Sequence, residues 1–153
     1  MTSSEGKQDG KELIAFRVGR QEFCIDVMLV REIRGWTEVT ALPRVPAYVK
    51  GVMNLRGAVL PIIDLGIRLG MPGAEPTARH VIIVVQLEQR QVGILVDAVS
   101  DILTVSDTLI QPVPDVTSTL VKSFVKGLLA VEGRMVSLIE VESLLPAAEL
   151  EPA

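Results

Sequence analysis

The segment GVMNLRGAVLPIIDL, residues 51–65, contains two short apolar runs on either side of an Asn-Leu-Arg-Gly turn. This pattern predicts a β-hairpin. Asn54 and Arg56 place an uncharged amide and a permanent cation inside the apolar run. The segment therefore indicates both a fold and a candidate site, because neither side chain is needed to form a strand.

The same segment recurs further along the chain. Tyr48-Val49-Lys50-Gly51 matches Phe124-Val125-Lys126-Gly127 at an offset of 76, and the match continues over the following strand pair. Val30 to Ile33 matches Val99 to Ile102 at an offset of 69. Two copies of one β-unit explain this repeat, and about five short strands in each copy are too few to bury both faces of an open sheet. We therefore predict an all-β protein made of two closed barrels packed against each other.

Other elements follow from alternating apolar residues and turn signals. Hairpins are expected over residues 12–27 and 80–96, and a third strand pair over residues 124–141. Asp26 is expected to cap a short helical turn in which Val30 and Ile33 lie on one side, and which ends at Gly35. The elements are thus mainly strands, with short helical turns between them.

Domain organisation follows from composition. Residues 70–79, GMPGAEPTAR, are rich in Gly, Pro and Ala and lack apolar periodicity, so we place a linker and a subdomain boundary there. A single domain is expected over residues 12–145, with approximate repeat halves 12–70 and 80–145.

The two ends of the chain are expected to lie outside this domain. Residues 1–11 are predicted to form a disordered N-terminal tail, and residues 146–153 a C-terminal tail. The opening MTSSEGKQDG is polar, and no apolar run approaches the roughly 20 residues that a membrane helix needs. We therefore expect a cytoplasmic protein without direct membrane insertion.

Composition argues against several kinds of ligand. Hydrophobic residues make up 48% of the chain but aromatic residues only 3%, so deep stacking sites for bases or sugars are not expected. The net charge is -4 and the Lys and Arg residues are scattered, which argues against nucleic acid. A single cysteine, Cys24, and a single histidine, His80, cannot build a disulfide framework or a thiol–imidazole metal site. We expect no cofactor, a buried Cys24 and an exposed His80.

Catalytic motifs are not found in the sequence. There is no nucleophile–base pair, no Gly-rich phosphate loop and no zinc spacing, so we predict that the protein is not an enzyme. A remote alternative is a barrel that binds a small ligand in its interior. Barrels of this size are normally filled by their own side chains.

The repeat provides an internal control for Asn54 and Arg56. At an offset of 76, Asn54 is replaced by Ala130 and Arg56 by Glu132, so the turn does not depend on either side chain. Two interpretations of Arg56 remain open. It forms a local ion pair with Asp64 or Glu32, or it contacts a partner, a role for which a planar guanidinium is well suited.

Several blocks of the chain resemble the CheW family of bacterial chemotaxis coupling proteins. These are Val30 to Trp36, the Pro43 to Pro46 loop, Tyr48 to Leu65, Val92 to Asp101, Ile110 to Pro114 and Val125 to Gly127. The resemblance covers roughly residues 12–145. It implies two SH3-like five-stranded barrels around a shared hydrophobic core, and a non-enzymatic adaptor.

Partners are also implied by this resemblance. CheW-like proteins join the cytoplasmic hairpin tips of chemoreceptors to the regulatory domain of the histidine kinase CheA, and they help assemble membrane-associated receptor arrays. The resemblance also implies other CheW-like domains as candidate partners in array rings. An alternative within the family is a paralogue that serves another motility or developmental pathway. The sequence does not separate these pathways.

The resemblance assigns two candidate surfaces. Receptor-binding positions match Val30, Glu32, Gly51, Asn54 and Arg56, where a groove of apolar residues with an acid and a guanidinium at its rim suits an amphipathic helix. Three of them have a structural alternative: Val30 as a core residue, Glu32 as a solvated charge, and Gly51 as a backbone requirement shared with Gly127.

Kinase-binding positions match the second proline loop. The residues are Gln111, Val113, Asp115 and Val116. Some family members carry a cation at the position of Gln111 and an aromatic residue at that of Val116, so this chain departs from a familiar pattern there. Loss of an aromatic ring weakens an apolar contact by roughly 1 kcal/mol or more.

Overall fold

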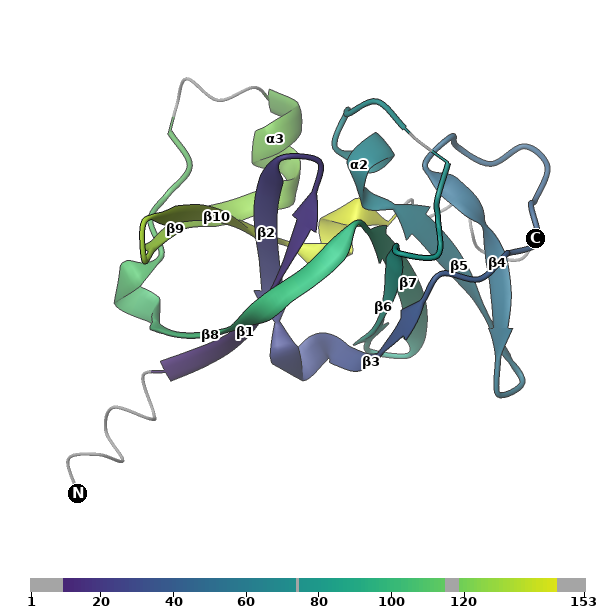
Figure 1. Ribbon diagram of the computed structural model, residues 1–153, viewed down its shortest axis with the longest axis horizontal. Helices are drawn as coiled ribbons and strands as arrows, with labels where there is room; N and C mark the ends of the chain where they lie inside the picture. Colours follow the sequence, from purple (N-terminus) through teal and green to yellow (C-terminus); the bar gives the residue numbers. More distant parts are fainter. Residues whose placement is uncertain (1–9, 74, 115–118, 146–153) are drawn as a thin grey trace.

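Two five-stranded sheets make up most of the molecule (Figure 1). The computed structural model describes residues 10–73, 75–114 and 119–145. Sheet A has the strand order β8-β1-β2-β10-β9, with β1 Gly10–Val18, β2 Gln21–Asp26, β8 Ala98–Ser106, β9 Val125–Val131 and β10 Arg134–Ile139. Sheet B has the order β3-β6-β7-β5-β4, with β3 Val30–Gly35, β4 Val49–Leu55, β5 Ala58–Asp64, β6 Val81–Leu87 and β7 Arg90–Val96. The predicted all-β class is confirmed.

The segment 51–65 forms the predicted hairpin. β4 and β5 pair antiparallel, with Leu55 opposite Ala58, so Arg56 and Gly57 are the two turn residues. Both have positive φ angles, 53° and 87°, as a two-residue turn between twisted strands requires. In the second copy Glu132 and Gly133 have φ angles of 51° and 77°. The turn conformation therefore does not depend on the arginine.

Each sheet closes on itself through one isolated backbone bridge. After β3, at one edge of sheet B, the chain returns to the opposite edge, where Thr40 and Val52 exchange two hydrogen bonds of 2.9 and 2.8 Å. After β8, Gln111 and Leu128 exchange two bonds of 2.8 Å in the same way. Sheets A and B are therefore called barrel A and barrel B below.

The glycine next to each bridge has no room for a side chain. A Cβ atom on Gly51 would lie 2.2 Å from the carbonyl oxygen of Thr40. A Cβ on Gly127 would lie 2.9 Å from the carbonyl oxygen of Gln111. The two glycines recur in the sequence because both barrels close at this point.

The two copies exchange hairpins. β1–β5 and β6–β10 correspond in chain order, but barrel A combines β1 and β2 of the first copy with β8–β10 of the second. Barrel B combines β3–β5 with β6 and β7. The parallel pairings correspond too, since Ile62 lies opposite Gly93 in barrel B and Leu138 opposite Cys24 in barrel A. The subdomain boundary placed at residues 70–79 is wrong, because each barrel takes strands from both sides of it.

Alternate residues of the strands fill three apolar clusters. In β1, Leu13 and Ala15 point into barrel A, whereas Ile14 and Phe16 point into a core shared by both barrels. The interior of barrel B is filled in the same way by Met53, Leu55, Leu60, Ile62, Ile82, Val84 and Leu95. The packed interiors argue against the alternative of a ligand-binding barrel.

The helical turn predicted to end at Gly35 is much shorter than expected. Asp26 caps it, accepting a hydrogen bond of 2.9 Å from the backbone nitrogen of Met28, but the 3-10 turn η1 covers only Val27–Leu29. From Val30 the chain is strand β3, paired with β6. Ile33 is 43% exposed instead of sharing a helical side with Val30.

The remaining helical segments are short. They are α2 Leu65–Arg68, η2 Asp107–Leu109, α3 Thr119–Phe124 and η3 Val141–Leu144. None of the described helices is long and apolar enough to cross a membrane. The predicted N-terminal tail is two residues too long, because β1 starts at Gly10. The rest of both predicted tails lies outside the described residues.

Candidate functional site

A groove of about 570 Å³ lies at one end of barrel B. It is bordered by the start of β3, the β4–β5 turn and the β6–β7 hairpin; its lining residues are Val30, Arg31, Glu32, Leu55, Arg56, Ala58, Val84 and Gln91. Three of the five predicted receptor-binding residues, Val30, Glu32 and Arg56, thus meet in one groove although they come from two separate segments of the chain.

An ion-pair cluster forms the rim of the groove. Arg56 Nη2 lies 2.8 Å from Glu32 Oε1, and Arg34 Nη1 lies 2.9 Å from Glu32 Oε2. Hydrogen bonds from Arg56, which have the larger effect, and from Arg34 lower the pKa of the Glu32 carboxyl below its usual value. The Arg56 side chain is 72% exposed and that of Glu32 only 23%. The arginine therefore presents its charge to solvent while the glutamate holds it in place.

Arg56 thus pairs with Glu32 and not with Asp64, the other carboxylate considered. Asp64 is buried, and its Oδ1 accepts a hydrogen bond of 3.1 Å from the backbone nitrogen of Ile67. It caps helix α2. The ion pair leaves most of the Arg56 side chain exposed, so Arg56 can still contact a partner protein.

Asn54 and Gly51 do not line this groove. The side chain of Asn54 accepts a hydrogen bond of 2.9 Å from the backbone nitrogen of Gly57 and so supports the β4–β5 turn. Gly51 lies at the closing bridge beside Thr40. The repeat had indicated the role of Gly51, because Gly127 matches it. It had not indicated that of Asn54, because Ala130 occupies the equivalent position of the second turn.

The predicted kinase-binding residues are only partly described. Gln111 is exposed, and its backbone forms the bridge that closes barrel A. Val113 is half-buried and packs against the shared core. Asp115 and Val116 lie outside the described residues.

A second ion cluster, at the end of barrel A, was not predicted from the sequence. Arg134 bonds to Glu22 through Nε and Nη2, at 2.9 and 2.6 Å, and to Asp101 at 3.0 and 3.1 Å. The repeat contained a signal for it, because Asp101 matches Glu32 at an offset of 69. The basic partner is supplied from a different strand, and no sequence spacing indicates that.

His80 is half-buried, so the prediction of an exposed histidine is wrong. Its Nε2 lies 3.4 Å from Asp97 Oδ1, and its Nδ1 accepts a hydrogen bond of 3.0 Å from the backbone nitrogen of Thr77. Asp97 Oδ2 also accepts a bond of 2.8 Å from the backbone nitrogen of Gly19. The contacts attach the end of the 70–79 segment to barrel A.

Cys24 is fully buried inside barrel A, as predicted. Burial raises the pKa of its thiol to about 12, which makes it an unreactive apolar residue. Within residues 10–73, 75–114 and 119–145, no group of three or more His, Cys, Asp or Glu residues is placed to hold a metal ion.

Two closed five-stranded barrels around a shared core define the fold class of this all-β protein, and the ion-paired groove lies at one barrel end. The chain belongs to the CheW-like domain family, whose family model matches residues 12–149.

Relatives of the chain carry the same family name. It is 65% identical to the chemotaxis protein CheW of Rhizobium meliloti, over 94% of this chain and 93% of that protein. It is 40% identical to CheW of Klebsiella aerogenes, over 95% of this chain and 87% of that protein. The crystal structure of the scaffolding protein TtCheW from Thermoanaerobacter tengcongensis superposes with a TM-score of 0.84 at 27% identity, covering 92% of this chain and 97% of that one.

Proposed function

We propose that this chain is a chemotaxis adaptor that couples the cytoplasmic tips of chemoreceptors to the histidine kinase CheA. The observation that carries the proposal is the groove of barrel B, where Val30, Glu32 and Arg56 meet. The accessible lining of the groove is mainly polar and includes a cation that Glu32 holds in place, which suits the polar face of a helical receptor hairpin tip.

The five receptor-site residues have different tasks in this proposal. Val30, Glu32 and Arg56 contact the receptor directly. Asn54 and Gly51 hold the β4–β5 hairpin, Asn54 through the turn and Gly51 through the closing bridge. Substitutions of these two residues therefore act through the position of Arg56.

Co-sedimentation tests the receptor contact. Purified protein is mixed with a receptor cytoplasmic fragment and CheA from the same organism, and we expect the kinase to pellet with the receptor only when the adaptor is present. Arg56→Ala is expected to remove this coupling. Its melting temperature should change little, because an exposed ion pair contributes little to stability.

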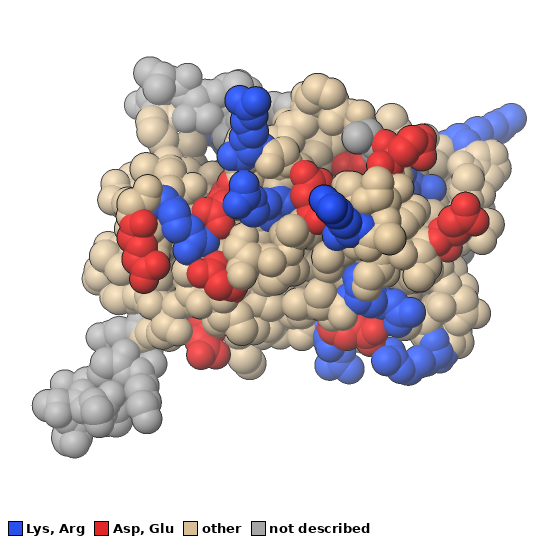
Figure 2. All heavy atoms as spheres, viewed as in Figure 1, with Lys and Arg blue, Asp and Glu red and all other residues tan. Residues whose placement is uncertain are grey.

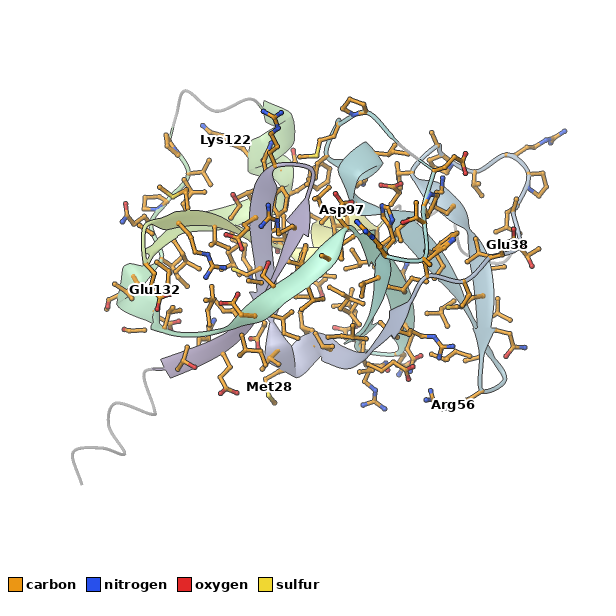
Figure 3. All side chains as sticks on the ribbon, viewed as in Figure 1. Met28, Glu38, Arg56, Asp97, Lys122 and Glu132 are labelled. Atoms are coloured by element: carbon orange, nitrogen blue, oxygen red, sulfur yellow. The ribbon has the colours of Figure 1, made fainter. Side chains whose placement is uncertain are left out.

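The matched control is Glu132→Ala. Glu132 occupies the equivalent turn of barrel A with nearly the same φ angle, 51° against 53° for Arg56. The two side chains lie at opposite ends of the molecule (Figure 3). Equal loss of coupling in both variants, or a wild-type chain that joins neither partner, would overturn the proposal.

We place the CheA contact on the second proline loop, at Gln111, Val113, Asp115 and Val116. Gln111 is the residue to test, because its side chain is exposed and only its backbone closes the barrel. Gln111→Ala should weaken binding of the CheA regulatory domain and leave receptor binding intact. Equal loss of both would mean that the two surfaces are not separate.

Array assembly follows from the same proposal. A chain that contacts receptor and kinase is recruited from the cytoplasm to membrane-associated arrays, where other CheW-like domains are further candidate neighbours in the rings. Binding of CheA without any chemoreceptor of the same pathway would instead favour a paralogue that serves another motility or developmental system.

A further inference from the structure

The groove at the Arg56 end of barrel B has a second hollow beside it. This hollow has a volume of about 370 Å³ and shares two lining residues with the groove, Ala58 and Gln91. The second hollow runs along the start of β5 to the tip of the β6–β7 hairpin, where Arg90 lies. The two hollows therefore adjoin at Ala58 and Gln91.

The equivalent surface of barrel A is closed. In the correspondence between the copies, Ala58 is replaced by Arg134, Gln91 by Glu22 and Glu32 by Asp101. Arg134 bonds to both acids there, at distances from 2.6 to 3.1 Å. The short Ala58 and the neutral Gln91 thus leave open in barrel B the place that a three-residue ion cluster fills in barrel A.

Charge at this surface has the opposite sign to that of the chain. The net charge of the protein is -4, but the two hollows are lined by Arg31, Arg56 and Arg90 and by only one acid, Glu32. Arg31 and Arg90 make no ion pair within the described part of the chain. Glu88 and Glu142 border Arg90 on another side, without an ion pair to it. Figure 2 shows blue side chains gathered around an acidic one at this end of the molecule.

Uncharged side chains complete the surface. Gln91, which lines both hollows, donates a hydrogen bond of 3.0 Å to Gln86, and this bond fixes its amide. Val59 is 66% exposed beside it and supplies apolar area at the rim. A basic surface with fixed amides and an apolar rim is complementary to an amphipathic helix whose polar residues are acidic.

We propose that the open end of barrel B, from Arg56 across Ala58 and Gln91 to Arg90, is one continuous groove that binds the acidic face of an amphipathic helix. This inference rests on the proposed function, in which the helix belongs to a chemoreceptor tip. Arg90 is then a specificity-determining residue of the receptor contact, and Ala58 is small because the helix passes over it.

The sharpest test closes the groove with the cluster that barrel A uses. The double variant Ala58→Arg/Gln91→Glu places an arginine and a glutamate beside Glu32, in the arrangement of Arg134, Glu22 and Asp101. We expect it to fold and to bind a purified receptor cytoplasmic fragment about tenfold or more weakly than the wild type, because the helix can no longer enter. The reciprocal variant Arg134→Ala/Glu22→Gln opens barrel A and should leave receptor affinity unchanged.

A charge reversal tests Arg90 without filling the groove. Arg90→Glu should lower the affinity about tenfold, and less so at high salt, because exposed charges are screened within about 10 Å at 0.1 M salt. Arg20→Glu is the matched control, since Arg20 lies in the turn of the β1–β2 hairpin, which corresponds to β6–β7 in barrel A.

The outcomes separate the inference from the proposed function. Wild-type protein that does not bind the receptor fragment overturns both. Wild-type protein that binds, and that loses affinity in Arg56→Ala but not in Arg90→Glu, overturns only the extended groove. Affinity lost equally in Arg90→Glu and Arg20→Glu also overturns it, because the effect would then reflect net charge alone.

Discussion

Among the described residues, Arg134 makes the most hydrogen bonds to carboxylates, two to Glu22 and two to Asp101. Its hydrogen bonds and charge lower the pKa of both Glu22 and Asp101, and the two carboxylates raise the pKa of the guanidinium. A carboxyl whose pKa is lower in the folded state stabilises the fold above its unfolded pKa and loses that contribution as pH falls through the folded value. Arg134 therefore links stability to pH on the acid side.

Arg134→Ala is expected to reduce the free energy of unfolding by about 1 kcal/mol near neutral pH, since the cluster is partly exposed. The difference from wild type should persist down to the ordinary carboxyl pKa values of 4.5 and 3.8 and shrink below them. Urea denaturation of both proteins across this range measures it. A difference that stays constant at all pH values would contradict the assignment.

Asn54 provides a second prediction at this scale. Asn54→Ala removes the hydrogen bond to the Gly57 nitrogen and is expected to cost about 1 kcal/mol, because an exposed backbone donor is then satisfied by water. The β4–β5 turn should keep its register, since Ala130 occupies the equivalent position. Thermal denaturation gives the stability, and amide chemical shifts of Arg56 and Gly57 report the turn; a shifted register would contradict this account.

At the scale of elements, barrel closure depends on two glycines. Gly51→Ala places a Cβ atom against the Thr40 carbonyl at a φ of +150°, and we expect it to cost about 2 kcal/mol or more. Gly35→Ala is the control, because nothing lies within 4 Å of its Cβ position. Chemical denaturation compares the two variants. Similar small losses would mean that the closing bridge is not a stabilising contact.

Hairpins were predictable from the sequence because apolar alternation and turn residues are local signals. Segments 12–27, 51–65 and 80–96 all form the expected strand pairs. Strand β3 was mistaken for a helical turn, because Val30 and Ile33 have helical spacing and Asp26 is a true cap. Pairing with β6 decides the conformation there, and such a long-range contact leaves no local signal.

The candidate site was predictable in part for a similar reason. Resemblance to the family and the internal repeat singled out Glu32 and Arg56, which meet in the groove. The contributions of Arg34, Ala58 and Gln91 were not apparent, because they depend on which strands lie side by side. Whether the groove binds a receptor remains a prediction.

On the scale of the whole molecule, the exchange of hairpins was beyond sequence analysis. The repeat identifies which positions correspond but not which copy each strand pairs with, and a boundary at residues 70–79 followed from composition alone. In the structure, each barrel instead contains strands from both copies (Figure 1). The shared core joins them further, with Ile14 and Ile63 of the first copy packed among Ile83 and Ile139 of the second.

A chain cut between Gly73 and Glu75 tests this organisation. We expect the two fragments to be poorly folded when expressed alone and to form a stable 1:1 complex when expressed together, because each barrel needs strands from both. Co-purification and near-ultraviolet circular dichroism measure this. A fragment that folds alone as a stable monomer would contradict the prediction.

The hairpin exchange also has an evolutionary consequence. In an ordinary duplicated gene either copy can be lost, shuffled or replaced, but here the loss of one copy would remove strands from both barrels. Substitutions in the interior of one copy must remain compatible with the other, whereas turns such as Arg56 and Glu132 lie outside that constraint. Selection can therefore make the two barrel ends diverge while the duplication itself stays inseparable.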